Sequence, residues 1–96
     1  MLSQTYHLIR SKTDGQYLVA RPRQPKADMA GYLLLFRERF EALSYLNTHA
    51  ADRADEFAVE SLASAQLGQL MQRWGFEGVG VVKDPLVPQI EFFSKT

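Results

Sequence analysis

The chain contains no cysteine, only two histidines and no long apolar run, and each shortage excludes a class of function. Without thiols the protein can form neither disulfides nor thiolate metal sites, and this composition suits a reducing cytoplasm. No stretch approaches the roughly 18 consecutive apolar residues of a membrane-spanning helix. The amino-terminal segment lacks the charged and apolar blocks of a secretory signal peptide. We therefore expect a cytoplasmic protein without a membrane partner.

Charge of either sign is not in excess, because 11 Lys and Arg balance 11 Asp and Glu. Nucleic-acid-binding domains usually carry a clear basic surplus, so this balance argues against nucleic acid as a partner. The two halves of the chain differ, however. Residues 1–40 hold seven basic and three acidic side chains, and residues 41–96 hold four and eight. The opposite charges either intermix in one sheet or form two opposed faces that would favour head-to-tail association.

Motifs for catalysis are also missing. Neither His7 nor His49 is flanked by residues in a metal-binding or nucleophile pattern. Gly75, Gly78 and Gly80 follow a predicted helix and precede a predicted strand, whereas a dinucleotide-binding loop follows a strand and opens a helix. We therefore expect no enzymatic activity, no cofactor and no bound metal.

The residues that are present are sufficient for one modest core, since 46% of the 96 residues are hydrophobic. A chain of this length is expected to fold as one domain, which we place at residues 1–96. The pair Asp14-Gly15 lies between two strand-like runs and predicts a β-hairpin with a two-residue loop. In that register Arg10 would lie opposite Val19.

Two helices are predicted from apolar side chains that recur every three or four residues. The first runs from Glu38 to about Ala50, and its apolar residues are Phe40, Ala42, Leu43, Leu46 and Ala50. In the second, Ser64 offers a cap oxygen and Gly75 a left-handed residue that ends the helix. The apolar face of the second helix consists of Leu67, Leu70, Met71 and Trp74.

Strands are predicted from short apolar, aromatic and β-branched runs. They lie at residues 6–10, 16–20, 32–36, 57–62, 78–82 and 89–93. The element order is therefore β-β-β-α-β-α-β-β, which predicts an α+β two-layer sandwich with a mixed sheet and both helices on one face. The first helix would cross over the sheet to deliver the strand at residues 57–62, and the second would make the same move toward residues 78–82.

Two surfaces are candidates for binding a partner. One is a basic, proline-containing loop with Arg21, Arg23 and Lys26, which suits an acidic segment or a phosphate. The other is the last strand, where adjacent Phe92 and Phe93 point to opposite faces. An exposed Phe93 beside a free strand edge would favour strand addition or dimerisation. The leading hypothesis is a non-catalytic interaction or regulatory domain that binds another protein, or a second copy of itself.

The alternative hypothesis is a small-ligand-binding protein or minor enzyme. Its pocket would lie between the first helix and the sheet, near Tyr45, His49 and Glu60. A further residue to explain is Gly68, which costs roughly 1 kcal/mol inside a helix relative to alanine. It would be explained by a close approach of the second helix to the sheet or to another chain.

The order of elements from residue 32 to residue 85 has a parallel in a known family. An apolar strand ends at Phe36, a helix contains Ala42-Leu43 and Tyr45-Leu46, and a later strand closes on Asp84-Pro85. The strand at residues 57–62 and the Leu67–Leu70 stretch lie between them. This pattern resembles the amino-terminal domain of the SseB family, proteins associated with type III secretion. The resemblance implies a shared arrangement of elements and brings no catalytic residues. The chain has Asp84 where that family often has Asn.

Overall fold

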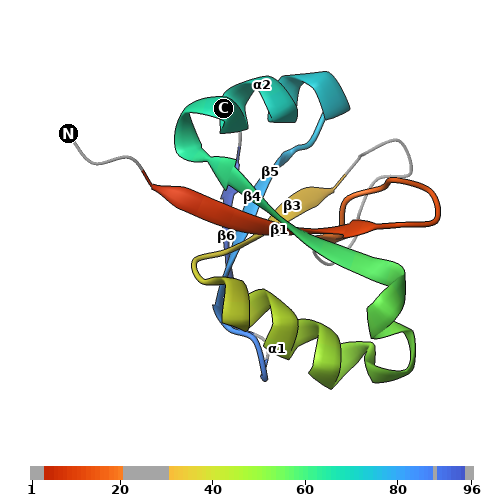
Figure 1. Cartoon of the computed structure of the whole chain (residues 1–96). Coiled ribbons are helices and arrows are strands. Elements are labelled where there is room, and N and C mark those ends of the chain that lie inside the picture. The colour runs from red at the N-terminus through yellow and green to blue at the C-terminus, as the bar shows by residue number, and fades with distance from the viewer. Residues whose placement is uncertain (1–3, 21–30, 88, 95–96) are drawn as a thin grey trace.

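A computed structural model describes residues 4–20, 31–87 and 89–94 (Figure 1). Its elements are β1 (Thr5–Ser11), β2 (Val19–Ala20), β3 (Tyr32–Phe36), α1 (Arg39–His49), the 3-10 helix η1 (Ala51–Glu56), β4 (Phe57–Ala63), α2 (Ser64–Trp74), β5 (Gly78–Asp84) and β6 (Gln89–Ser94). The predicted α+β class and the order of strands and helices are confirmed. Neither α1 nor α2, among the residues described, has the length and apolar content to cross a membrane.

The strands form one mixed sheet in the order β4-β1-β3-β5-β6, with β2 paired to the start of β3. Only β3 and β5 are parallel neighbours, and the other described pairs are antiparallel. The central strand β3 is covered on both faces, as its unbroken apolar run predicts. Its residues from Leu33 to Phe36 are at most 1% exposed.

The two helices cover opposite faces of the sheet, so the prediction of two helices on one face is wrong. Figure 1 shows α2 above the strands and α1 below them. One core cluster joins α1 to Leu34 and Phe36, and the other joins α2 to Leu33 and Leu35. Successive side chains of a strand point to opposite faces, so β3 supplies both clusters. The fold therefore has three layers.

The direction of the two crossovers explains this arrangement. Strand β1 is antiparallel to both β3 and β4 and lies between them, so β3 and β4 are parallel but not adjacent. The chain thus moves outward to β4 through α1 and then returns past β3 to β5 through α2. Because crossovers between parallel strands are almost always right-handed, a reversal of direction within the sheet places the second helix on the other face.

The hairpin between β1 and β2 has a four-residue loop instead of the predicted two. Arg10 lies opposite Tyr17, and Ser11 N–H donates to the Gln16 carbonyl at 2.8 Å. The Asp14 carboxylate accepts a hydrogen bond from Gln16 N–H at 3.0 Å, and this bond lowers the pKa of Asp14. The pairing is therefore shifted by two residues. A shift of two keeps every side chain on its predicted face.

The helix ends are partly as predicted. Gly75 has a φ of 72° and donates to the Met71 carbonyl, which confirms it as the left-handed stop of α2. Ser64 is the first helical residue and does not cap the helix, whose first turn begins after Ala63. In α1, Ala42 and Leu46 are buried as expected. Phe40 and Leu43 are instead 64% and 42% exposed, because α1 packs a narrower face than the sequence pattern suggested.

Candidate functional site

The sheet ends in two edge strands that differ in chemistry. Strand β6 is exposed over most of its length, and both of its phenylalanines are partly accessible: Phe92 is 41% exposed and Phe93 48%. Phe93 lies on the face covered by α2, and Phe92 lies on the α1 face, where its ring meets that of Tyr32 edge-to-face at 5.2 Å. An exposed aromatic pair on an edge strand is a surface that can bind another strand.

The backbone of β6 directs hydrogen-bonding groups away from the protein. The carbonyl oxygen of Phe93 points toward β5, since it occupies the space that a Cβ on Gly78 would take. Backbone groups of alternate residues in a strand point to opposite sides. The N–H and C=O groups of Ile90, Phe92 and Ser94 therefore point to the free edge. In the described part of the chain no strand pairs with that edge.

The opposite edge, β4, is protected. Leu18 N–H donates to the Ile9 carbonyl at 2.8 Å, so the backbone groups of Ile9 face β2. Its partner Val59 therefore turns its carbonyl outward, and the Arg39 guanidinium donates to that oxygen at 3.4 Å. Charged side chains of this kind commonly prevent edge strands from pairing with other chains.

An open groove of about 560 Å³ runs between α2 and the β5–β6 pair. Leu67 and Met71 line it from the helix, and Val79 and Phe93 line it from the sheet. No charged side chain is among its described lining residues. Gly68 also faces the groove, and a Cβ added there would meet no atom within 4 Å. The predicted close approach of the second helix to the sheet at Gly68 is therefore wrong.

Only one of the four residues predicted to bind a partner can be placed. Arg21, Arg23 and Lys26 lie outside the described residues. Phe93 lies on the free edge strand and lines the α2 groove, so it is accessible from both the edge and the face of the sheet. The sequence analysis named Phe92 only as the neighbour of Phe93 and did not name Ile90 or Ser94, because the direction of their backbone groups depends on the β5–β6 register.

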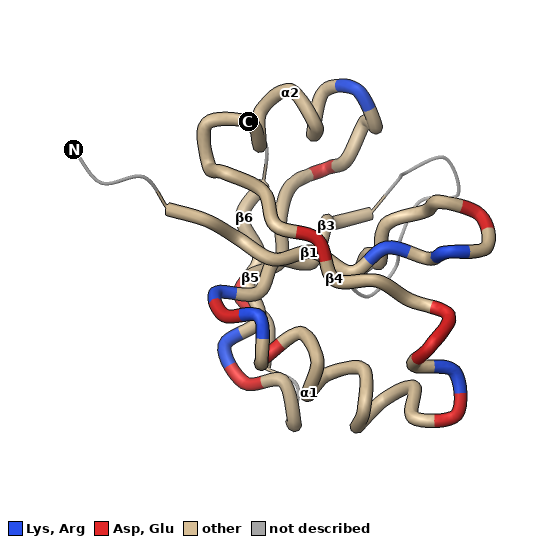
Figure 2. Tube along the Cα trace, viewed as in Figure 1, with Lys and Arg blue, Asp and Glu red and all other residues tan. Residues whose placement is uncertain are grey.

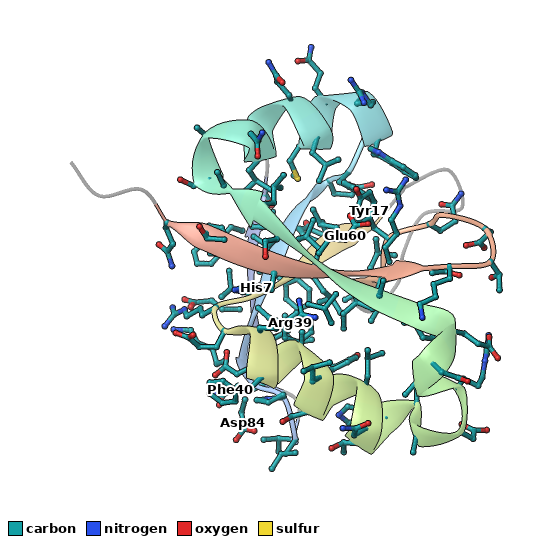
Figure 3. All side chains as sticks on the ribbon, in the orientation of Figure 1. His7, Tyr17, Arg39, Phe40, Glu60 and Asp84 are labelled. Carbon is teal, nitrogen blue, oxygen red and sulfur yellow. The ribbon has the colours of Figure 1, made fainter. Side chains whose placement is uncertain are left out.

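The three residues of the alternative pocket do not all come together, because Tyr45 and His49 are neighbours and Glu60 lies on the other face of the sheet. Tyr45 packs against Phe36, and its ring lies 4.6 Å from that of His49, whose Nε2 is 2.9 Å from the Pro85 carbonyl oxygen. Partial burial raises the pKa of the Tyr45 hydroxyl. Glu60 pairs with Leu8, which belongs to the α2 cluster, and so faces the other side of the sheet. Figure 3 shows Glu60 beside Tyr17, above the sheet and away from α1.

A smaller groove of about 310 Å³ does lie between α1 and β4, where the alternative placed its pocket. Its lining includes Leu43, Leu46 and Phe57 with the cations Lys12 and Arg39. None of Tyr45, His49 and Glu60 lines it. The alternative site is therefore wrong as a set of three residues, because Tyr45 lies on the α1 face of the sheet and Glu60 on the α2 face.

An unpredicted cluster surrounds Arg10. Its guanidinium carbon lies 4.8 Å from the Tyr17 ring centre and 6.0 Å from that of Trp74. The same side chain donates to the Gly15 carbonyl at 2.8 Å and lies 3.6 Å from the Glu60 carboxylate. These contacts join the hairpin, β4 and α2, so the cluster has a structural role. A two-residue loop would have placed Val19 opposite Arg10, so the residue pattern did not predict this cluster.

Charges of both signs are interspersed over the described fold instead of gathering on opposed faces (Figure 2). The Arg10–Glu60 pair shows the cause, because β1 from the basic half lies beside β4 from the acidic half. No group of three His, Asp or Glu side chains suited to a metal ion occurs within the residues described. His7 Nδ1 lies 3.4 Å from Ser61 Oγ on the neighbouring strand, an exposed cross-strand contact.

Comparison with protein-family models, curated proteins and solved structures finds no match to this chain. The resemblance of residues 32–85 to the SseB family therefore stays a prediction based on the residue pattern. The fold defines the class of protein as α+β with an open, mixed, six-stranded sheet.

Proposed function

We propose that the chain is a small, non-catalytic protein-interaction domain whose partner binds at the β6 edge. The observation that carries this proposal is the combination, on one strand, of two exposed phenylalanines and of backbone groups that no described strand pairs with. Edge strands of natural proteins are usually protected from such contact, as β4 is by Arg39. A strand that keeps its edge open and apolar is suited to binding another polypeptide.

Binding would follow the physics of strand addition. A partner strand would take the outward N–H and C=O groups of Ile90, Phe92 and Ser94 into a new ladder. Its side chains would alternate between the two faces, next to Phe92 on one side and Phe93 on the other. The backbone bonds would supply affinity, and the side-chain contacts on the two faces would supply specificity.

The basic residues Arg21, Arg23 and Lys26 belong to the proposal as a separate contact for an acidic segment of a partner. Reversing two of these charges, with Arg21→Glu and Arg23→Glu, would weaken a complex that uses them and leave the fold unchanged. The proposed location of the interaction is the cytoplasm, in keeping with a chain that lacks cysteine.

The test is capture of protein partners from an extract of the natural source with three tagged chains: the parent, Phe93→Ser and Leu43→Ser. Leu43 is a matched control, because it is 42% exposed against 48% for Phe93 and lies beside β4 at the other edge. We expect a stoichiometric partner that is lost with Phe93→Ser and kept with Leu43→Ser, while circular dichroism shows all three chains folded. A partner that binds the three chains equally would show that β6 is not the binding surface.

A further inference from the structure

The open edge of β6 is suited to pairing with an identical edge. Its single charged side chain, Glu91, forms an ion pair with Lys83 of the adjacent strand at 3.1 Å. The strand therefore carries almost no uncompensated charge that would repel a second β6. Charged side chains are one common means by which edge strands avoid self-association, and β6 uses this means only weakly.

One register makes the strand self-complementary. In antiparallel pairing about a two-fold axis at Phe92, Phe92 lies opposite Phe92 of the second copy, and Ile90 lies opposite Ser94. These are the residues whose backbone groups point to the free edge, so each of these pairs can form the two hydrogen bonds of a closely spaced pair. Glu91 then lies opposite Phe93. Pairing about Glu91 would instead place two carboxylates opposite each other, which is unfavourable.

The side chains on the α1 face support the same axis. Each Phe92 ring already meets Tyr32 of its own chain at 5.2 Å, and the Tyr32 hydroxyl lies 3.3 Å from Ser94 Oγ. Pairing would continue this contact into a row of four rings, Tyr32 and Phe92 from each copy. Cross-strand aromatic pairs are among the contacts that stabilise antiparallel sheets.

We infer that the chain forms a symmetric dimer in which β6 pairs antiparallel with β6 of a second copy, centred on Phe92. The inference rests on the proposed function, because it names the occupant of the same edge. The two sheets would then join into one continuous sheet. The α2 grooves of the two copies would open on the same face of it, because an axis perpendicular to the sheet preserves its faces.

Sedimentation equilibrium of the full chain tests the dimer with the parent, Phe92→Lys and Leu43→Lys. The first substitution would place two ammonium groups opposite each other at the axis and remove the aromatic pair, whereas the second adds the same charge beside β4. We expect a concentration-dependent dimer for the parent and for Leu43→Lys. For Phe92→Lys we expect a dissociation constant about tenfold higher or more.

A second measurement uses the absence of cysteine from the natural sequence. The single thiol of Phe92→Cys would face its own copy across the axis, where a Cα separation of about 5.5 Å lies within disulfide range. Mild oxidation should therefore link this variant into a covalent dimer at low protein concentration, while the control Leu43→Cys remains unlinked.

The results separate this inference from the proposed function. A parent chain that stays monomeric at every concentration refutes self-pairing, and so does a Phe92→Lys variant that dimerises like the parent. If such a chain still captures a Phe93-dependent protein, the proposed function stands with a foreign strand on β6. If capture is also independent of Phe93, both proposals are wrong.

Discussion

Replacing Gly68 with alanine should stabilise the protein. The residue lies in the middle of α2, where it is exposed and borders the open α2 groove, and an added Cβ would meet no atom within 4 Å. The substitution therefore changes backbone propensity without changing packing. Alanine is favoured over glycine in a helix interior by about 0.8–1.0 kcal/mol. For a domain of this size such a gain raises the melting temperature by about 4–8 °C.

Two other glycines supply controls with the opposite sign. Gly75→Ala has equal space around its Cβ but a φ of +72°, so the left-handed conformation should cost about 1–2 kcal/mol. Gly78→Ala places a methyl group against the Phe93 carbonyl oxygen and the Ser94 Cα, two backbone atoms that cannot rotate away. Overpacking of this kind typically lowers the free energy of unfolding by about 1–3 kcal/mol. We expect a loss near the upper end of this range for Gly78→Ala, because the atoms in contact belong to the backbone.

The assay is urea and thermal unfolding followed by circular dichroism on the parent and the three variants, at one low protein concentration. A destabilised Gly68→Ala chain would refute the reasoning, because it would mean that atoms of this chain or of a bound one fill the space above Gly68. An unchanged Gly75→Ala chain would equally contradict the assignment of a left-handed helix end.

Three further predictions concern the core, the Arg10 cluster and Tyr45. Phe36→Ala should lower the free energy of unfolding by about 3–5 kcal/mol in urea denaturation, because Phe36 is 0% exposed, and a loss below about 1 kcal/mol would contradict its burial. Arg10→Ala should cost about 1–2 kcal/mol because it removes stacking on Tyr17 as well as charge. Glu60→Gln should lower the free energy of unfolding by less than about 0.5 kcal/mol, since both side chains of the Arg10–Glu60 ion pair are more than one third exposed. Equal losses for Arg10→Ala and Glu60→Gln would mean that the ion pair, and not the stacking on Tyr17, supplies the stability. The pKa of Tyr45 is raised by burial from an ordinary 10.0, so the folded state holds this proton more tightly than the unfolded chain. The stability that this group contributes should be complete below about pH 10 and lost as the pH rises through the folded pKa. In Tyr45→Phe the melting temperature should therefore fall less steeply with pH above about pH 10 than in the parent. Melting-temperature curves of the two chains that run parallel in this pH range would disprove the effect.

Local signals in the sequence predicted the elements well, because they depend on neighbouring residues. The spacing of Leu67, Leu70, Met71 and Trp74 and the stop at Gly75 give α2 almost to the residue. The placement of the helices was not predictable in the same way. It depends on β1 lying between β3 and β4, and this pairing joins residues far apart in the chain.

In the candidate site, too, features set by neighbouring residues were predictable and features set by the pairing of distant strands were not. The placement of Phe92 and Phe93 on opposite faces of the last strand follows from their adjacency, and the position of that strand at the edge of the sheet leaves both rings partly exposed. The free backbone groups at Phe92 depend on the register with β5, which no local pattern fixes. Tyr45, His49 and Glu60 were grouped on the assumption of a single helical layer. That grouping fails because Glu60 faces the second layer.

The position of β3 has a consequence for the order of folding. This strand is the most apolar in the described chain, yet its parallel neighbour β5 lies near the carboxyl end, with Leu34 paired to Gly80. During synthesis α1, β4 and α2 emerge while one side of β3 is still unpaired. Contacts between such distant segments form late, and an uncovered apolar edge is prone to aggregate meanwhile. We therefore expect chains truncated before Gly78 to aggregate and scatter light on refolding, while the full chain does not. In the full chain, the β5–β6 hairpin would cover the unpaired side of β3 in a late step of folding.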